Sequence, residues 1–324
     1  MTEPVPASGA AEPAAVPAAE DQARRDRLLR LATAVSVSVA SVLAILKLAA
    51  WLVTGSAAIL SSLLDSLVDV AASGILLISV RHALRPPDRS HRFGHGKAES
   101  LGAIMQAAFI AGSAVLLIFE SAGRFITPTP IAEVPLGIAV MAISFVATIV
   151  LIIFQQNVAR RTASSAIAAD RLNYVGDTAT SAVVLVVLLM GQQSGWLWLD
   201  PAAAIGIALW LLLSAWRIAR RAADSLMDRE LPREDRTRIA AIVRADPEVV
   251  DLHDLRTRSA GGTRFIELHV EMDGALTLRQ AHTVCDRLEA ALRRDFPDAE
   301  VLLHQEPAGL DDERLDHRIG APRP

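Results

Sequence analysis

Two aspartates four residues apart sit inside a long apolar stretch. Asp65-Ser-Leu-Val-Asp69 lies between Gly55 and Arg81. Residues at this spacing leave the same face of an α-helix, so both carboxylates can bind one object. An aspartate at the centre of a membrane helix costs roughly 2.5 to 3.5 kcal/mol on insertion scales, so such residues normally face a bundle interior and bind or relay something. The spacing predicts half of a cation site.

The other half is predicted about a hundred residues later. Asn173 and Asp177 have the same spacing within the apolar segment 165–190. Two such helices side by side would offer three carboxylates and one amide, an all-oxygen cage. Alternatively, one aspartate pairs with Lys47 and another caps or kinks a helix. A single lysine cannot neutralise three acids, and unpaired buried charge is expensive, so we favour the cation site.

The composition indicates a membrane protein. Of the 324 residues, 52 % are hydrophobic, and the mean hydropathy of +0.35 is too high for an ordinary soluble chain. The net charge of −4 gives no reason to expect a nucleic-acid partner. The single cysteine, Cys285, excludes an internal disulfide and a cysteine-based zinc cluster, and it is predicted to lie in a core. Residues 1–23 lack an apolar core and predict a disordered tail rather than a signal peptide.

Six apolar segments are long enough to cross a bilayer, which takes roughly 20 helical residues. We place them at 28–53, 57–80, 101–122, 134–154, 165–190 and 198–218. Arg and Lys gather before the first segment, after the second, after the fourth and after the sixth, whereas the opposite connections hold only Arg124. This distribution predicts that both termini are cytoplasmic and that the acids lie near the midplane. Lys47 could either snorkel to the interface or pair with an aspartate.

A small soluble α/β domain is predicted after Arg221, where acids, bases and apolar residues alternate. We expect helices at 232–244 and 278–294 and strands at 249–259, 264–272 and 300–304, with a tight turn at Gly261-Gly262. In the second strand Ile266, Leu268 and Val270 share one face, and His269 lies on the other. The predicted organisation is a tail at 1–23, a transmembrane domain at 24–225, a cytoplasmic domain at 226–307 and a flexible tail at 308–324.

The histidines form two informative groups. Asp88, His91 and His95 follow the second apolar segment at a spacing suited to a surface zinc-type site, although a polar loop docking on lipid phosphates or on the soluble domain fits equally well. The second group is scattered over the soluble domain, so only the fold can bring its members together. Its members are His253, His269, His282 and His304, with Glu306.

These motifs resemble the cation diffusion facilitators, and most closely the bacterial ferrous-iron and zinc efflux branch. The resemblance is carried by Asp-Ser-Leu-Val-Asp, by His-Arg-Phe-Gly-His-Gly-Lys-Ala-Glu-Ser at 91–100, by His-Asp-Leu-Arg-Thr-Arg at 253–258 and by His-Gln-Glu-Pro at 304–307. It runs from about Arg24 to Pro307, and the decapeptide is highly specific. Only the two tails fall outside it.

The resemblance implies a homodimer of six-helix protomers in the inner membrane, each with a metallochaperone-like, ferredoxin-like α/β domain. It implies exchange of a divalent metal for protons by alternating access, without enzymatic activity or a catalytic cofactor. It also implies roles for residues: a transport site at Asp65, Asp69, Asn173 and Asp177; a loop site at Asp88, His91 and His95; a cytoplasmic site at His253, His269, His282 and His304 with Glu306 nearby; an inter-protomer charge pair between Lys97 and Asp228; and an apolar gate at Leu172.

Two residues depart from the pattern of that branch. Glu306 replaces an aspartate, which keeps the charge, and Asn173 replaces a histidine, which changes the chemistry. Imidazole favours Zn²⁺, whereas oxygen ligands favour harder ions, so we expect a shift toward Mn²⁺ or Fe²⁺ with Zn²⁺ still bound. The asparagine side chain does not titrate, so the protons exchanged for metal must bind to the aspartates.

Other functions fit the same residues less well. A zinc-preferring pump of the same family remains open. Two membrane-buried aspartates also describe an intramembrane aspartyl protease, but the required Gly-x-Gly-Asp is absent because Tyr174 stands two residues before Gly176. A metal sensor or metal-gated channel is the remaining alternative, and counterflow of protons would separate it from a carrier.

Overall fold

The computed structural model describes residues 15–55, 57–126, 135–194, 199–310 and 314–319. Two compact units divide the chain. One comprises Arg25–Asp228, and the other comprises Arg229–Pro324 together with the N-terminal residues up to Arg24. Each unit is described by itself.

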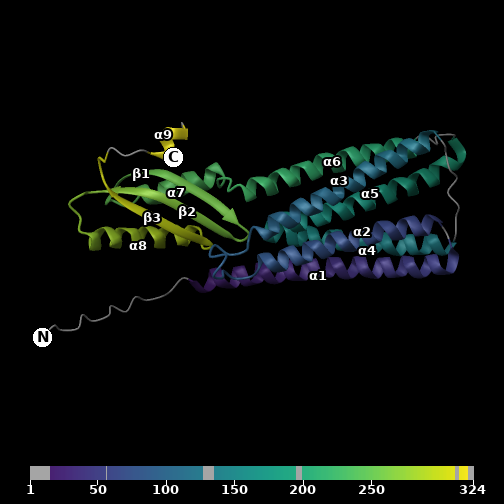
Figure 1. Ribbon diagram of the computed structural model, residues 1–324, viewed down its shortest axis with the longest axis horizontal. Coiled ribbons are helices and arrows are strands. Elements are labelled where there is room, and N and C mark those ends of the chain that lie inside the picture. Colours follow the sequence, from purple (N-terminus) through teal and green to yellow (C-terminus); the bar gives the residue numbers. More distant parts are fainter. Residues whose placement is uncertain (1–14, 56, 127–134, 195–198, 311–313, 320–324) are drawn as a thin grey trace. The chain divides into compact units, whose positions relative to one another are not determined.

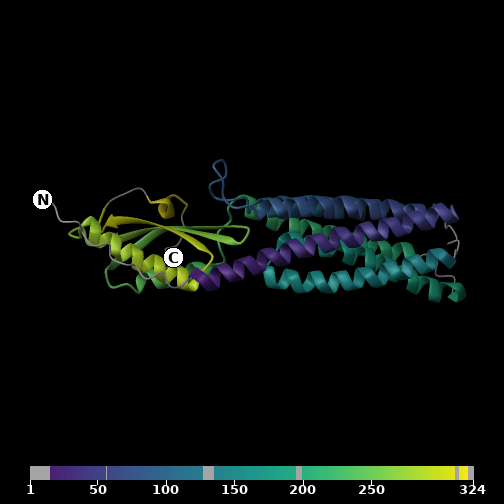
Figure 2. The same ribbon diagram turned by 90° about the horizontal axis from the view of Figure 1, so that it is seen from below.

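The first unit is built from long helices that run alongside one another (Figures 1 and 2). They are α1 (Ala15–Thr54), α2 (Ala57–Ala83), α3 (Ala98–Ile126), α4 (Pro135–Thr162), α5 (Ser165–Ser194) and α6 (Leu199–Leu226). A helix satisfies all its backbone hydrogen bonds internally, which is the requirement for crossing lipid. The predicted starts at Val134 and Trp198 lie outside the described residues.

Five described stretches are long and apolar enough to cross a membrane: Glu20–Thr54, Ile59–Ala83, Ala98–Gly123, Val140–Thr162 and Pro201–Leu226. α5 is not among them, and its first half carries Asp170, Arg171 and Asp177. Nevertheless α5 packs against α3, α4 and α6, so it belongs to the same bundle. That α5 is a sixth span stays a prediction.

Small residues let the helices approach closely at two points. A Cβ atom added at Gly102 of α3 would lie 2.7 Å from the Cβ of Ser79 on α2, and one added at Gly176 of α5 would lie 2.8 Å from the Leu211 side chain on α6. Both distances are too short for real contacts, so at either glycine a larger side chain would displace its neighbour on the facing helix. Gly176 immediately precedes Asp177, so this close contact lies next to one of the predicted metal-binding residues.

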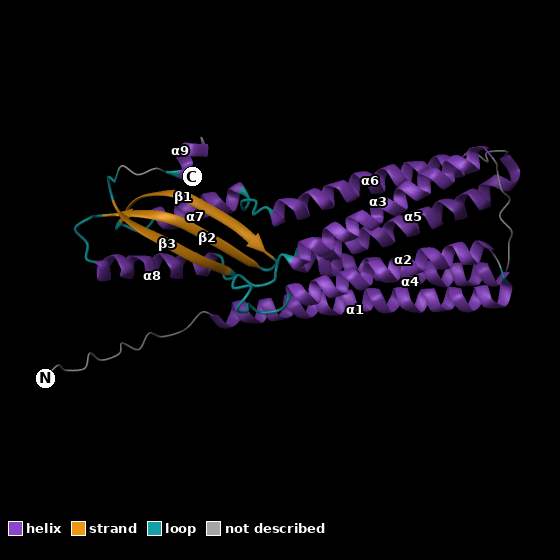
Figure 3. Ribbon diagram, viewed as in Figure 1, coloured by secondary structure: helices purple, strands orange, loops and turns teal. Residues whose placement is uncertain are grey.

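The second unit is a sheet covered by helices (Figure 3). Its elements are α7 (Arg233–Arg244), β1 (Val249–Ala260), β2 (Thr263–Met272), α8 (Leu278–Asp295), β3 (Ala299–Pro307) and α9 (Leu315–Ile319). The strand order is β1-β2-β3, with β2 antiparallel to β1 and parallel to β3. The tight turn between β1 and β2 falls where it was predicted, and Gly261 there adopts a φ of 63°, which glycine accommodates without strain.

The core of this unit lies between the sheet and the helices α7 and α8. Ile266, Leu268 and Val270 of β2 are fully buried against Leu288 and Leu292 of α8. The side chain of Thr277 and the side chain of Gln280 form a reciprocal capping box that starts α8. Cys285 lies in this core as expected, and burial raises the pKa of its thiol. The alternation seen in the sequence therefore identified the inner face of β2 correctly.

Both tails contain more helix than the sequence suggested. α1 begins at Ala15, so residues 15–23 are helical rather than disordered; four of these nine residues are alanine, the best helix former, and the stretch continues directly into an apolar helix. The tail after Ala308 contains α9, which docks on β1. Residues 1–14, 311–313 and 320–324 lie outside the described residues.

Candidate metal-binding sites

The predicted transport site is partly assembled between α2 and α5. The Asn173 side-chain Nδ2 donates a hydrogen bond to Asp69 Oδ1 at 2.7 Å, which joins the two motifs directly. Asn173 is buried and Asp69 half-buried, whereas Asp65 and Asp177 are exposed within the single chain. The three carboxylates do not come within 4.8 Å of one another as a group in the part of the chain that the structure describes. The structure thus brings one pair together and leaves two flanking acids apart.

Lys47 of α1 approaches these acids without a direct ion pair to them among the described contacts. Its Nζ donates to Ser66 Oγ at 2.7 Å and to the Ser62 carbonyl at 3.2 Å. From there its charge interacts electrostatically with all three aspartates. These contacts match neither the predicted snorkelling of Lys47 nor a direct pair with an aspartate. Instead, Ser62 and Ser66 of α2 hold its ammonium group beside the site.

Leu172, the expected gate residue, precedes Asn173 and is buried. It belongs to a cluster that includes Ile110 of α3 and Leu211 of α6. Its side chain therefore fills the contact between α5 and the pair formed by α3 and α6. A gating role for it remains a proposal.

The loop group converges as its spacing suggested. Asp88, His91 and His95 each offer a ligand atom within 4.8 Å of the others. Asp88 Oδ2 lies 3.3 Å from His95 Nε2, and Asp88 Oδ1 lies 3.5 Å from His91 Nδ1. The N–H groups of His91 and Ser90 donate to Asp88 and lower the pKa of that carboxyl below its usual value. This carboxylate is ready to accept a cation at neutral pH.

One further histidine lies against this loop group. The His82 ring, in the last turn of α2, has its centroid 4.7 Å from that of His95. The sequence analysis missed His82, although its position at the end of the second apolar segment, six residues before Asp88, was a usable signal.

Three histidines of the second unit form a row across the sheet. Strand register pairs His253 of β1 with His269 of β2, and His269 with His304 of β3. The ring centroids are 5.0 Å apart for the first pair and 4.7 Å apart for the second. The row lies on the face of the sheet opposite α7 and α8, because the neighbouring residues Leu268 and Val270 point into the core.

Glu306 bridges this histidine row. Its carboxylate lies 2.8 Å from His269 Nδ1, 3.3 Å from His253 Nε2 and 3.3 Å from His304 Nε2. His269, His304 and Glu306 satisfy the distance requirement for a shared ion, and so do His253, Asp254 and His269. Three nitrogens and one carboxylate on one face make a ligand set typical of zinc and related metals.

His282 does not join this group within one chain. It lies on α8, its side chain is 72 % exposed, and its nearest acidic partner is Asp286 at 3.8 Å. α8 covers the opposite face of the sheet, which explains the separation. The resemblance grouped His282 with the other histidines, and the structure does not bring it to them in a single protomer.

The C-terminal helix α9 docks beside the histidine row. Asp254 accepts hydrogen bonds from the N–H groups of Leu315 and Asp316 at 2.8 and 2.9 Å, and the Asp316 carboxylate accepts the N–H of Asp254 at 3.0 Å. Arg314 pairs with Glu271 at 2.6 Å, and Glu271 lies 3.3 Å from His253. The sequence analysis assigned no role to Glu271 or to Asp254.

Burial acts to raise the pKa of Asp254, but the N–H groups of Asp316 and Leu315, with the nearby His253 and His269, hold it below its usual value. The carboxylate that anchors α9 is therefore charged at neutral pH.

Lys97 and Asp228 form a charge pair within one chain. Lys97 Nζ lies 2.9 Å from Asp228 Oδ1 and also donates to the Leu226 carbonyl at 3.2 Å. The resemblance implied a pair between protomers. Lys97 directly precedes α3 and Asp228 follows α6, and these two helices pack along their length, so their ends meet within the protomer.

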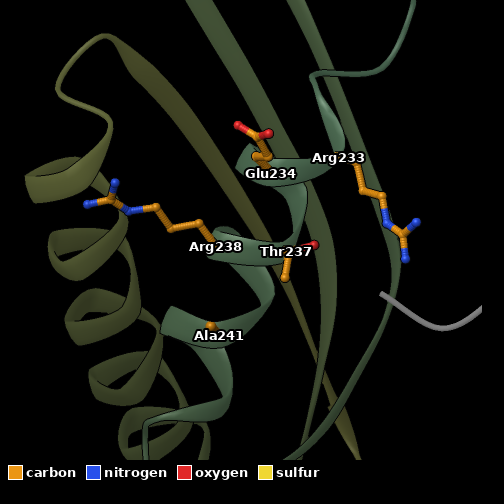
Figure 4. A pocket seen from close by; sticks show the side chains of 5 residues that line it. All are labelled: Arg233, Glu234, Thr237, Arg238 and Ala241. Atoms are coloured by element: carbon orange, nitrogen blue, oxygen red, sulfur yellow. The ribbon is translucent and has the colours of Figure 1, made fainter.

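A pocket on α7 has no metal-binding character. Arg233, Glu234, Thr237, Arg238 and Ala241 line it (Figure 4). The lining has no histidine and one carboxylate. The Arg238 side chain reaches toward α8, where its Nε donates to Asp295 at 2.8 Å.

Two family models match most of the chain. Residues 33–227 match the family described as the cation efflux transmembrane domain, and residues 231–308 match the cation efflux protein cytoplasmic domain. The cation-efflux pump FieF of Citrobacter koseri is 45 % identical over 284 residues, which is 88 % of this chain and 94 % of the relative. The Escherichia coli protein of the same name is 44 % identical over the same shares.

A solved structure, the metal-bound C-terminal domain of the CzcD transporter from Thermotoga maritima, is 28 % identical. The match covers 25 % of this chain and all of that domain, with a TM-score of 0.24. The two matched domains together span most of the chain. This multi-pass protein therefore belongs to the cation efflux family and is a cation efflux transporter.

Proposed function

We propose that the chain exports divalent metal ions from the cytoplasm in exchange for protons, and that its transport site comprises Asp65, Asp69, Asn173 and Asp177. The observation that carries the proposal is the 2.7 Å contact between Asp69 and Asn173, because it joins the two motifs at one point of the bundle. A dication entering there would gain both flanking carboxylates and relieve their mutual repulsion.

The metal preference follows from the donor atoms. Asp69, Asn173 and the two flanking aspartates offer only oxygen, so the site favours Mn²⁺ or Fe²⁺ more than a site with one imidazole would. Zn²⁺ still binds, since carboxylates are also zinc ligands. A zinc-preferring pump is the competing outcome.

Proton exchange follows from the clustered acids. When the site is empty, Lys47 supplies one positive charge to three carboxylates, so at least one of these holds a proton. An arriving dication displaces that proton. Transport is therefore expected to depend on pH without an imidazole at residue 173.

The cytoplasmic histidines are proposed as a second, regulatory metal site. The histidine row with Glu306 would bind metal when its cytoplasmic concentration rises, and the resemblance implies that this occurs in a homodimer. Because His282 is exposed in one protomer, it could contribute to a metal site that a second copy of the chain completes. The arrangement of Arg and Lys between the helices supports an inner-membrane protein with both termini in the cytoplasm.

The deciding experiment measures transport of Mn²⁺, Fe²⁺ and Zn²⁺ separately in vesicles containing the purified full chain. Wild type should carry Mn²⁺ or Fe²⁺ at least as well as Zn²⁺, and Asn173→His should raise the Zn²⁺ rate. Arg293→Ala, a change on the exposed surface of α8, controls for purification and insertion. Efficient Zn²⁺ transport by wild type without Mn²⁺ or Fe²⁺ transport would show that the selectivity is that of a zinc pump.

A further inference from the structure

A second polar centre lies one helical turn from the Asp69–Asn173 contact. On α5, Asp170 precedes Asn173 by three residues, and on α2, Ser73 follows Asp69 by four. Ser73 Oγ donates to Asp170 Oδ1 at 3.1 Å. The two contacts are therefore successive links between the same pair of helices. Asp170 has no exposed surface, and the sequence reasoning overlooked it because it has no aspartate partner at helical spacing.

Five helices contribute to what we call the Asp170 cluster. The carboxylate accepts four hydrogen bonds: from Ser36 Oγ at 2.5 Å, Ser73 Oγ at 3.1 Å, Gln106 Nε2 at 3.3 Å and Gln155 Nε2 at 2.6 Å. The Tyr174 hydroxyl contacts Ser73 Oγ at 3.0 Å and Ser36 Oγ at 3.4 Å. These residues come from α1, α2, α3, α4 and α5, so any movement of α5 against its neighbours changes the number of donors.

Two opposing effects act on the Asp170 carboxyl. Complete burial disfavours its charged form, and four donors favour that form. Every hydrogen-bond donor on it among the described residues is neutral. The titratable groups that face the cluster are Tyr174 on its own helix and Asp69 on α2, while α1, α3 and α4 present Ser36, Gln106 and Gln155. Because no cation contacts Asp170 among the described residues, its negative charge is stabilised by the four neutral hydrogen-bond donors alone.

Gln155 equips the cluster for both protonation states. Its Oε1 is buried and has no hydrogen-bond partner in the part of the chain that is described. A half-turn of this amide replaces the Nε2 donor with the Oε1 acceptor. The separation of 2.6 Å suits an O–H···O bond from a protonated carboxyl as well as a short N–H···O bond to a carboxylate. The same cage therefore accommodates a carboxylate and a carboxylic acid.

We propose that Asp170 is a proton-binding site of the transport cycle, separate from the metal-binding acids. With the cluster intact, four donors hold the carboxylate. When α5 moves away from these donors and water does not replace all of them, the carboxylate takes one proton from a hydronium ion, which leaves one water molecule and a neutral acid. When the donors return, the O–H bond breaks and the proton returns to water. This inference rests on the proposed metal–proton exchange.

The test compares wild type, Asp170→Asn and Ser73→Ala in vesicles, with Zn²⁺ and Mn²⁺ as separate probes and with protons counted per metal ion. Asp170→Asn keeps the size of the side chain but cannot titrate, so the proton count should fall by about one and the pH dependence should flatten. Ser73→Ala removes one donor to the carboxylate, so the pH midpoint of transport should move upward. A purely structural role would lower the amount of folded protein without moving either quantity.

An infrared measurement covers the case in which Asp170→Asn does not fold. Wild type titrated from alkaline to acidic pH should gain the C=O band of a buried carboxylic acid, and this band should appear at higher pH in Ser73→Ala. Absence of the shift would overturn the proposal, and so would an unchanged proton count in folded Asp170→Asn.

Failure of the proposed function has a different signature. If wild type moves neither metal, or if Asp69→Ala moves as much as wild type, metal transport by this site is wrong irrespective of Asp170. If wild type transports, Asp69→Ala does not, and Asp170→Asn keeps the wild-type proton count, only the present inference fails.

Discussion

The two principal candidate sites differ in how far the fold assembles them. In the cytoplasmic unit, strand register places His253, His269 and His304 in one row, and Glu306 touches all three. In the helical unit, only Asp69 and Asn173 touch, and Asp65 and Asp177 remain exposed. A sheet fixes its side chains by backbone hydrogen bonds, whereas helices fix theirs only by packing. A site that must release its ion benefits from ligands that can separate, while a sensing site benefits from preformed ligands.

The largest expected effect is on transport. Asp69→Ala removes the one carboxylate that bridges to α5, so transport should fall by about 100-fold or more, since even outer partners of metal ligands contribute 10- to 100-fold. Metal binding by the cytoplasmic unit should be unchanged. Vesicle flux and equilibrium metal binding on the same full-length preparation measure both. A parallel loss of the two would contradict the independence of the sites.

The next effect concerns the histidine row. His269→Ala removes its central member, so metal affinity of the cytoplasmic unit should fall by about 10- to 100-fold. His282→Ala should cost much less if the site is completed within one protomer, because the structure leaves His282 exposed. Calorimetric titration with Zn²⁺ compares the two. Equal losses would instead place the partner subunit's His282 in the site.

A smaller effect is expected at α9. Arg314→Ala leaves the largely buried Glu271 without its arginine, and the docking of α9 should weaken by about 1 to 2 kcal/mol. Faster hydrogen exchange at the N–H groups of Leu315 and Asp316 reports this loss. His317→Ala at an exposed position of the same helix is the matched control, and equal acceleration in both variants would argue against the Arg314 contact.

The smallest effect depends on pH. The folded-state pKa of Asp254 lies below its usual value near 3.8, so this carboxylate stabilises α9 docking at neutral pH, and the contribution is lost as the pH falls through that lowered pKa, below about 4. Exchange at Leu315 and Asp316 should therefore stay slow from pH 8 to 5. Asp254→Asn should accelerate it throughout this range. Release of α9 in wild type near pH 6 would contradict the assignment.

Periodicity and motif spacing predicted the elements well but not their long-range contacts. Alternation along β2 identified both of its faces, and apolar length identified the helices, since these are local properties. Glu306 as the bridge of the histidine row depends on the parallel pairing of β2 with β3, which no local pattern encodes. Asp170 was missed for the same reason, because its four donors come from four other helices.

The histidine row also constrains the order of events during synthesis. Its ligands come from all three strands, and β3 can pair with β2 only after α8 has crossed over the sheet. A growing chain that has emerged only as far as β2 exposes His253 and His269 without Glu306. The histidine row therefore gains His304 and Glu306 only after β3 has been synthesised, whereas His253, Asp254 and His269 can come together as soon as β1 pairs with β2.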